Sequence, residues 1–404
     1  MTTTILKIQK STPHAPLKGR GRIVSQGFTL IEVMIGLALS LIAMVVVLQV
    51  FSVSSSRKSV IVGGAEAQQI ASVASFQMGR VFRIGGSGFA NARSAIGCPI
   101  AATKSGQILP IPTVLTAPFD GVNQTIRVIP VLVYAGTGGN GSDVLVTISD
   151  SSEVSTAEYD FDGAAGATSI VVKNSNGIRA KDFLLATNPV DPLVANPDVC
   201  TVVQVNSTFA TYNYAAAPRL ATVTAIPLGV TSVYNTSGAL SLYPLSTRML
   251  NLGQTPSFHI YGVDDKNRLL QKDLLQLSGS ATSVMAENIV DFRVLYGVDT
   301  DDDGVLNDWV APTGSWSAAT LSAGTAAATR QIKQILAIRT ALVVRSAEAA
   351  ADAEPKTSYV MFNDIAALKQ TVTIATNQQK RRHQVLESIV PLRNLRLPQP
   401  PPSL

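Results

Sequence analysis

The hydrophobic pattern is continuous near the start of the chain. Between residues 23 and 56 the only charged side chain is Glu32, and residues 28–53 form one apolar run. At about 1.5 Å per residue, a helix of this length crosses a bilayer core of about 30 Å. The run is longer than the apolar core of a cleaved secretory signal, and residues 52–56 make a poor cleavage site. The pattern therefore predicts a membrane-spanning helix over 28–53.

Beyond this run the pattern becomes amphipathic. A serine-rich stretch leads to Gly63-Gly64, which we expect to loosen or break the helix. Apolar residues then recur at helical spacing as far as Gly85-Gly86; they are Ile70, Val73, Ala74, Met78 and Val81. Residues 54–84 are therefore predicted to continue the helix outside the membrane, with one face available to pack on a sheet.

From about residue 105 the period changes to that of strands. Short β-rich runs separated by Gly, Asn, Asp and Pro clusters predict an antiparallel β domain over 85–394. These runs are 125–134, 143–148, 169–172, 183–186, 199–205 and 221–226. A weakly patterned stretch, 313–330, is expected to be a flexible excursion within this domain. Alternation returns at 338–344, a further strand-like run covers 385–392, and the Pro-rich tail, 395–404, is expected to be disordered.

The excess of positive charge is confined to the first 27 residues. The chain carries 32 Lys and Arg against 27 Asp and Glu, and the leader holds five of these bases with no acid, at Lys7, Lys10, Lys18, Arg20 and Arg22. The body is therefore balanced, and nothing in its charge indicates nucleic-acid binding. Because basic residues before the apolar run outnumber those after it, the positive-inside rule keeps the N-terminus cytoplasmic and exports the rest.

The two cysteines, Cys98 and Cys200, both lie in the part predicted to be exported. An oxidising compartment permits a disulfide between them. The alternative, two buried free thiols, stays open because the sequence does not tell how far apart their Cα atoms lie.

The sequence provides little that indicates catalysis. Its three histidines, His14, His259 and His383, are too few for a multi-histidine metal site, and there is no G-x-S-x-G element. Residues 136–141 match G-x-G-x-x-G, but a strand-like run follows where a dinucleotide site needs a helix, so we interpret them as a hairpin loop. The basic run 380–383 lacks interleaved aromatics and is interpreted as a solvated turn.

One acidic cluster resembles the opening of a calcium loop. Asp299, Asp301 and Asp303 alternate, and Gly304 occupies the sixth position. The twelfth position is Val310 where a bidentate acid belongs, although Asn307 and Asp308 are potential substitutes. The cluster is a weak calcium candidate, and the alternative is an acidic hairpin tip between 294–296 and 309–310.

The start of the apolar run carries the most specific motif. Residues 27–32 read GFTLIE after a basic leader, which closely resembles the class III signal of type IV prepilins and type II secretion pseudopilins. The resemblance implies that a prepilin peptidase cuts between Gly27 and Phe28, N-methylates Phe28, and leaves Glu32 as the fifth mature residue. It also implies that Glu32 serves assembly of the filament.

Scattered similarity narrows the family. The chain resembles the PilW group of minor pilins in segments over most of its length: 80–98, 141–143, 200, 296–301, 338–346 and 390–394. The resemblance implies an α+β, pilin-like fold in which a long N-terminal membrane-spanning helix packs on an antiparallel β domain. It further implies an inner-membrane protein whose globular domain lies in the periplasm. Such a protein joins other minor pilins and the major pilin, either to initiate a pilus or to form its tip.

Two alternatives to this hypothesis differ in partners or in class. A minor pseudopilin of a type II secretion system shares the signal and the helix. A membrane-anchored periplasmic enzyme or binding protein instead keeps its leader. The pilin hypothesis predicts no catalytic residues and no cofactor, apart from the weak calcium candidate.

Overall fold

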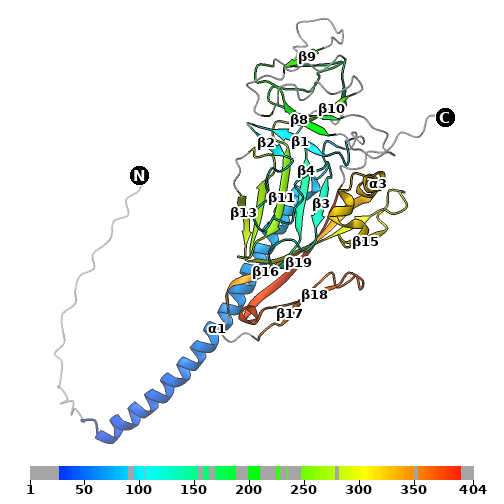
Figure 1. Ribbon diagram of the computed structural model, residues 1–404. Helices are drawn as coiled ribbons and strands as arrows, with labels where there is room; N and C mark the ends of the chain where they lie inside the picture. Colours follow the sequence, from blue (N-terminus) through cyan, green and yellow to red (C-terminus); the bar gives the residue numbers. More distant parts are fainter. Residues whose placement is uncertain are drawn as a thin grey trace, which may run out of the picture. The chain divides into compact units, whose positions relative to one another are not determined.

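The computed structural model describes 27–89, 95–104, 106–152, 158–162, 169–187, 199–209, 224–227, 234, 247–277, 282–349 and 354–392 (Figure 1). Most of the predicted leader and the predicted Pro-rich tail lie outside these residues. The chain divides into two compact units, Met1–Ser55 and Ser56–Leu404. The second unit holds the sheets, so the fold combines an N-terminal apolar helix with antiparallel β sheets, an α+β arrangement that confirms the predicted class.

Helix α1 (Leu30–Arg83) contains the apolar run as 54 uninterrupted helical residues. Its segment Leu30–Ser55 has a mean hydropathy of 2.7, and its large apolar side chains are exposed. Outward-facing apolar side chains on every side of a helix are what a bilayer stabilises. An apolar helix long enough to cross a membrane is thus present at nearly the predicted bounds, and the span itself stays a prediction.

The expected break at Gly63-Gly64 is wrong, because α1 continues through both glycines. A Cβ built on Gly63 would lie 3.2 Å from Cβ of Ser346 in strand β16 (Ile335–Ala349). Each glycine costs a helix about 1 kcal/mol. Burial of the following turns outweighs that cost, since Ala67, Ala71, Ala74, Met78 and Phe82 are all buried.

The buried face of α1 packs on a five-stranded antiparallel sheet. The ring of Phe82 meets Tyr261 edge-on, with centroids 5.7 Å apart. The helix ends at Arg83, just before Gly85-Gly86, and Gly86 takes φ 80°. The sheet has the order β13 (Thr282–Glu287), β12 (Arg268–Asp273), β11 (Ser257–Val263), β4 (Val144–Ser149) and β3 (Val131–Tyr134).

The 136–141 segment is a hairpin connection, as predicted. Strands β3 and β4 pair antiparallel across it, and it contains the short 3-10 turn η1 (Gly139–Gly141). A Cβ on Gly139 would lie 2.5 Å from backbone of Asp264, so glycine permits this close approach. No helix follows that could hold a pyrophosphate.

A four-stranded antiparallel sheet is buried on both faces. The alternation at 338–344 predicts one buried face, but Ala341 and Val343 on the other face are also buried. The hairpin of β17 (Ser358–Met361) and β18 (Gln370–Thr373) covers them through Tyr359, Met361 and Ile374. The sheet has the order β15 (Asp308–Val310), β14 (Ile289–Val298), β16 and β19 (Arg381–Pro391), and the 3-10 turn η3 (Thr376–Gln378) precedes β19.

Arg339 joins this sheet to the covering segment. Its guanidinium donates to both carboxylate oxygens of Asp364, at 2.8 and 2.6 Å, and through Nε to Glu387 of β19 at 3.1 Å. The other oxygen of Glu387 accepts the Phe362 amide at 2.6 Å. One cation with two carboxylates therefore anchors the 362–364 turn to the sheet.

The six-stranded sheet separates two hydrophobic cores. Leu185 and Val202 face the main core, whereas Leu184 and Val203 face a second core with Tyr159 and Met249. All described pairs are antiparallel except β1 with β8. The order is β2 (Gln107–Leu109), β1 (Ile100–Thr103), β8 (Cys200–Gln204), β7 (Phe183–Thr187), β10 (Arg248–Gly253) and β5 (Glu158–Asp160); β6 (Ser169–Val172) and β9 (Thr224–Pro227) form a separate pair.

The stretch 313–330 is ordered and helical where the sequence led us to expect a flexible excursion. It forms η2 (Gly314–Trp316), α2 (Ala318–Leu321) and the start of α3 (Ala326–Gln334). Ser317 and Thr325 cap the two α-helices by accepting amides three residues on. Burial of Leu321 and Ile332 then fixes the segment on the core. We interpreted the alanine-rich composition of 313–330 as weak patterning. Alanine has the highest helix propensity, however, so this composition favours a helix where a capping residue begins it.

A buried carboxylate joins the two larger antiparallel sheets. Asp143, just before β4, accepts the Gly136 and Val294 amides at 2.9 Å each, and Arg293 Nη1 lies 3.5 Å away. Burial raises the pKa of Asp143 to about 6. The two amide donors and the charge of Arg293 lower this pKa, but their effect is smaller than that of burial. The native protein therefore holds this proton more tightly than the unfolded chain does.

We predict that stability falls as pH rises from about 4 to about 6. A native pKa above the unfolded value stabilises the fold fully below about pH 4, and this contribution, on the order of 3 kcal/mol, is lost as pH rises through the native pKa. Denaturant unfolding at a series of pH values should show this fall. It should be smaller in Asp143→Asn, where the raised pKa values of Asp150, Asp182 and Asp291 still contribute, and unchanged in Asp120→Asn, whose carboxyl is exposed. The same fall in both variants would contradict the assignment to Asp143.

Candidate functional sites

The predicted processing site lies at the exposed beginning of α1. Gly27 and Phe28 precede the helix, and 83% of the Phe28 surface is exposed. No described side chain covers the peptide bond between them, since a Cβ on Gly27 would meet nothing within 4 Å. Among the described residues this bond is therefore exposed.

Glu32 is held by the first turn of its own helix. Its Oε2 accepts both the Thr29 amide and the Thr29 hydroxyl at 3.0 Å, and Thr29 Oγ1 accepts the Glu32 amide at 3.3 Å. This reciprocal arrangement is a capping box. The sequence analysis missed it, although T-x-x-E directly before an apolar run is its known signal. The carboxylate thus faces the beginning of the helix, on the side of Phe28.

The structure confirms the disulfide between Cys98 and Cys200. Their Cα atoms lie 5.9 Å apart, and both residues are buried. Cys98 lies two residues before β1 and Cys200 begins β8, which pairs with β1 through Ile100. The bridge therefore fixes the one parallel strand pair of the described sheets.

The acidic loop brings the three predicted carboxylates together. One oxygen each from Asp299, Asp301 and Asp303 lies within 4.8 Å of the others. Asp299 is fully buried and accepts the amides of Asp303 at 3.2 Å and Gly304 at 2.8 Å. The loop is also the tip of a hairpin, because β14 and β15 pair on either side of it.

The potential substitutes for the missing twelfth ligand are engaged elsewhere. Asn307 Oδ1 accepts the Thr300 amide at 2.7 Å, and Asp308 Oδ1 accepts the Trp309 amide at 2.7 Å. Val310 itself lies in β15. Three carboxylates without a bidentate ligand resemble weak extracellular sites rather than tight ones. Calcium binding stays a prediction.

That prediction is tested by thermal unfolding of the full chain in detergent. Binding to the native state alone should raise the melting temperature at millimolar Ca²⁺, and Asp301→Ala with Asp303→Ala should abolish the rise. Asp264→Ala with Asp265→Ala, in another turn, provides the control. An unchanged melting temperature in the wild type would leave the loop as an acidic hairpin tip.

The described histidines lie apart from any metal-binding cluster. His259 Nδ1 contacts the Ser257 hydroxyl, and His383 Nδ1 contacts the Arg381 carbonyl at 3.0 Å. The interpretation of 380–383 as a solvated turn holds only for Lys380. Arg381–His383 begin β19, and the buried His383 ring stacks on Tyr359 at 6.3 Å because β19 continues the sheet there. His14 lies outside the described residues.

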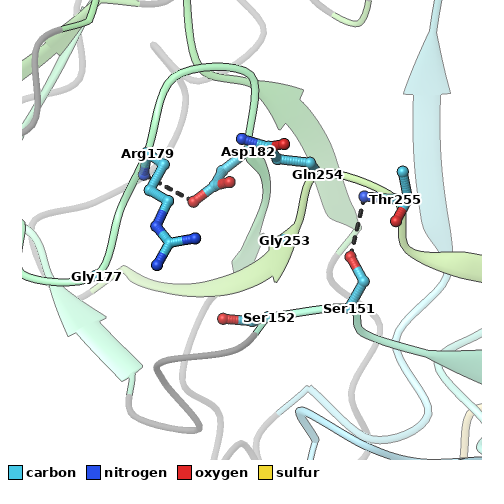
Figure 2. A pocket seen from close by; sticks show the side chains of 8 residues that line it. All are labelled: Ser151, Ser152, Gly177, Arg179, Asp182, Gly253, Gln254 and Thr255. Atoms are coloured by element: carbon cyan, nitrogen blue, oxygen red, sulfur yellow. Dashed lines mark hydrogen bonds between the residues drawn. The ribbon is translucent and has the colours of Figure 1, made fainter.

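A polar pocket of about 170 Å³ opens beside β10 (Figure 2). It is lined by Ser151, Ser152, Gly177, Arg179, Asp182, Gly253, Gln254 and Thr255. None of these residues is a histidine or a cysteine. The single carboxylate is Asp182, and burial raises its pKa, against hydrogen bonds that lower it.

The polar groups of this pocket already serve the local fold. Asp182 Oδ2 accepts the Arg179 amide at 2.7 Å, and Ser151 Oγ accepts the Thr255 amide at 2.9 Å (Figure 2). Asp182 Oδ2 also accepts from Asn251 Nδ2 at 2.8 Å. Gln254 donates to the Ala180 carbonyl at 3.0 Å. The pocket therefore does not combine a nucleophile with a base, which a hydrolytic site requires.

Two family models match the chain, one near its N-terminus and one over its C-terminal third. Residues 24–48 match the prokaryotic N-terminal methylation motif, and residues 260–394 match the family model of type IV pilus-assembly protein W. The second match begins within β11 and ends two residues beyond the last described residue, Leu392. No curated protein and no solved structure matches the chain.

Together with the apolar helix and its α+β fold, these matches define the chain as a type IV pilin that prepilin peptidase processes. Within that class it is a minor pilin of the PilW type. It is anchored to a membrane, and it is a structural component of the pilus that assembles with other pilins.

Proposed function

We propose that this minor pilin helps to initiate a type IV pilus or to form its tip. It would first reside in the inner membrane as a single-pass protein, with its globular domain, 85–394, in the periplasm. Other minor pilins and the major pilin would then join it, and the chain would move into the filament. The observation that carries this proposal is the exposed Gly27-Phe28 bond directly before an apolar helix, in a chain with a PilW match.

The six-stranded sheet supports an end position in the filament. Strands β1, β2, β5, β7, β8 and β10 all lie before residue 260 and therefore outside the PilW match. A subunit within a filament has neighbours on every side, whereas a subunit at the end has room for additional structure. The extra sheet is therefore easier to accommodate in a tip or priming complex than along the shaft.

Residues 1–27 are proposed to act as the cytoplasmic leader. Cleavage after Gly27 and N-methylation of Phe28 would give a mature chain whose fifth residue is Glu32. The span 28–53 would then hold the subunit in the membrane, and 54–84 would continue as helix against the domain.

Mass spectrometry of the mature N-terminus tests the processing step. We expect a methylated Phe28 terminus in cells with prepilin peptidase and an intact leader in cells without it. Gly27→Leu should block cleavage, whereas Gly36→Ala, within the same helix, should not. A leader retained in peptidase-containing cells would contradict the proposal and would favour a membrane-anchored protein of another class.

A further inference from the structure

Strand β19, drawn in red in Figure 1, forms one edge of the four-stranded sheet and, among the described strands, pairs with β16 alone. In such an antiparallel pair, alternate residues direct their backbone N–H and C=O groups toward the neighbouring strand. The Leu392 amide donates to the Leu336 carbonyl at 2.7 Å, which assigns the even-numbered residues to this set. The odd-numbered residues from 383 to 389 therefore present their backbone groups on the opposite side.

The outward backbone groups of 383–389 are open. Among the described residues, no hydrogen bond to any of them is found. On one side of this stretch the Arg381 carbonyl accepts from the His383 ring, and on the other Pro391 has no N–H. We call 383–389 the open edge. It is about 20 Å long, since a strand rises about 3.3 Å per residue.

The other edges of the three larger sheets are protected from further pairing. At β3, the Val133 amide donates to the buried Tyr296 hydroxyl at 2.6 Å. At β13, a bulge at Met285 interrupts the register with β12. The edge strands β2, β5 and β15 are three residues long each. Short, bulged or covered edges are the usual means by which native sheets avoid a foreign strand. Strand β19 has 11 residues and no bulge between 383 and 391, so it lacks these protections.

The side chains beside the open edge are largely apolar. Ile389 is 56% exposed. Val385 is half-buried against the core under the β17-β18 hairpin, and Leu386 is half-buried against the main core on the other face of the sheet. A strand added at this edge would extend both cores, so we expect apolar side chains on it opposite these three residues.

Charge at the beginning of β19 restricts the partner further. Arg382 is exposed, and within the described part of the chain no ion pair with it is found. Glu387, the one acid of β19, accepts from Arg339 Nε at 3.1 Å. Two copies of β19 paired antiparallel about Leu386 would place Arg382 opposite Val390. A second copy would thus leave the cation unmatched, whereas a different chain can place an acid beside it.

We propose that the open edge accepts a β-strand from another pilin of the same pilus. This strand would carry apolar side chains beside Val385 and Ile389 and an acidic side chain beside Arg382. In β-strand addition, main-chain hydrogen bonds supply affinity and the alternating side chains supply specificity. The inference rests on the assembly of the chain with other pilins, and it identifies the surface that holds a neighbour. It does not depend on a position at the tip.

Photocrosslinking in cells that assemble pili tests the proposal. A benzophenone amino acid replaces Ile389 in the full-length chain, and mass spectrometry identifies the crosslinked peptides after irradiation. We expect crosslinks to a segment of alternating apolar residues in the globular domain of another pilin. The matched control carries the same group at Val284, which is 47% exposed on the bulged edge of β13 and should give at least about fivefold fewer crosslinks to pilins.

Substitutions at Val385 test whether the contact uses the backbone. Combined with the crosslinker at Ile389, Val385→Pro removes an outward N–H that β16 does not use. Proline is tolerated on an edge strand where its missing N–H faces away from the sheet, so the sheet should persist while the crosslinking yield falls at least about tenfold. Val385→Thr keeps the N–H and a β-branched side chain, and it should retain most of the yield.

A charge reversal tests the acidic side chain of the partner without touching the core. Arg382→Glu changes an exposed side chain, so it should keep the fold. It should lower the yield from Ile389 at least about threefold, because like charges on paired strands repel. Lys266→Glu, in an exposed turn between β11 and β12, makes the same charge change and should leave the yield unaltered.

Three outcomes would overturn the proposal. Crosslinks from Ile389 to a second copy of this chain, or to other residues of the same copy, would assign the open edge to a different occupant. A yield from Ile389 no higher than that from Val284 would show that no pilin strand lies there. An undiminished yield in both Val385→Pro and Arg382→Glu would exclude pairing along the backbone. Recovery of the wild-type chain in the pilus fraction of the same cells shows separately whether the chain enters a pilus.

Discussion

Replacing Cys98 and Cys200 together by serine should lower the free energy of unfolding by about 4 to 5 kcal/mol. The bridge closes a loop with a sequence separation of 102 residues, and the loss of the cross-link frees this loop in the unfolded chain. The bridge also holds β1 beside β8, so the variant should become protease-sensitive around these strands first.

Denaturant unfolding of the full chain in detergent, with and without reductant, measures this effect. Reduction should weaken the wild type to the level of the double variant and leave the double variant unchanged. Cys98→Ser alone should match the double variant, because either substitution removes the cross-link. A difference of less than about 1 kcal/mol between oxidised wild type and double variant would contradict the prediction, because it is far below the loop-closure value.

The elements that the sequence predicts well are those with local signals. The apolar run determines the first half of α1 by itself, and Gly85-Gly86 marks its end. The disulfide is favoured by compartment, although only the structure shows that the two Cα atoms are close enough. The hairpin at 136–141 follows from the strand pattern on both sides of it.

The elements that it predicts poorly depend on contacts between distant residues. Helix α1 continues through Gly63 because the turns after it are buried, and Ser346 approaches Gly63 closely; nothing near Gly63 in the sequence indicates that contact. The second buried face of β16 exists because the β17-β18 hairpin covers it. The two helices after residue 316 had local signals in Ser317 and Thr325, and those caps were overlooked.

The candidate sites also differ in whether their residues are neighbours in the sequence. Gly27, Phe28 and Glu32 form a contiguous motif, so the sequence was sufficient to nominate them. The neighbourhood of Arg345 and His383 could not be predicted, because the two residues are brought together only by the pairing of β16 with β19. The run 380–383 by itself suggests a solvated turn, and the buried His383 shows that this interpretation was incomplete.

Glu32→Leu should leave cleavage intact and reduce incorporation into sheared pili by at least tenfold. An unpaired carboxylate within an apolar segment costs a few kcal/mol, so an acid there calls for a cationic partner. Cleavage would supply such a partner, because the amine of Phe28 stays cationic after methylation. A lost contact of about 1.4 kcal/mol already lowers an equilibrium constant tenfold. The measurements are the mass of the cleaved chain and its amount in the pilus fraction.

The capping box allows charge and helix capping to be separated. Glu32→Gln keeps a side chain that can accept from Thr29, because glutamine also serves at this position of the box, but it removes the charge. Thr29→Val does the reverse, since it removes the hydroxyl and keeps the carboxylate. If Glu32 pairs with the terminal amine of a neighbouring subunit, Glu32→Gln should fail as Glu32→Leu does, and Thr29→Val should incorporate.

Glu66→Gln provides the matched control, since it removes an acid from the same helix beyond the span and should assemble normally. Normal incorporation of cleaved Glu32→Gln together with failure of Thr29→Val would assign Glu32 to the cap of its own helix. Normal incorporation of cleaved Glu32→Leu would exclude both roles and would leave the carboxylate, near the helix end and within reach of water, as a group that serves the peptidase alone.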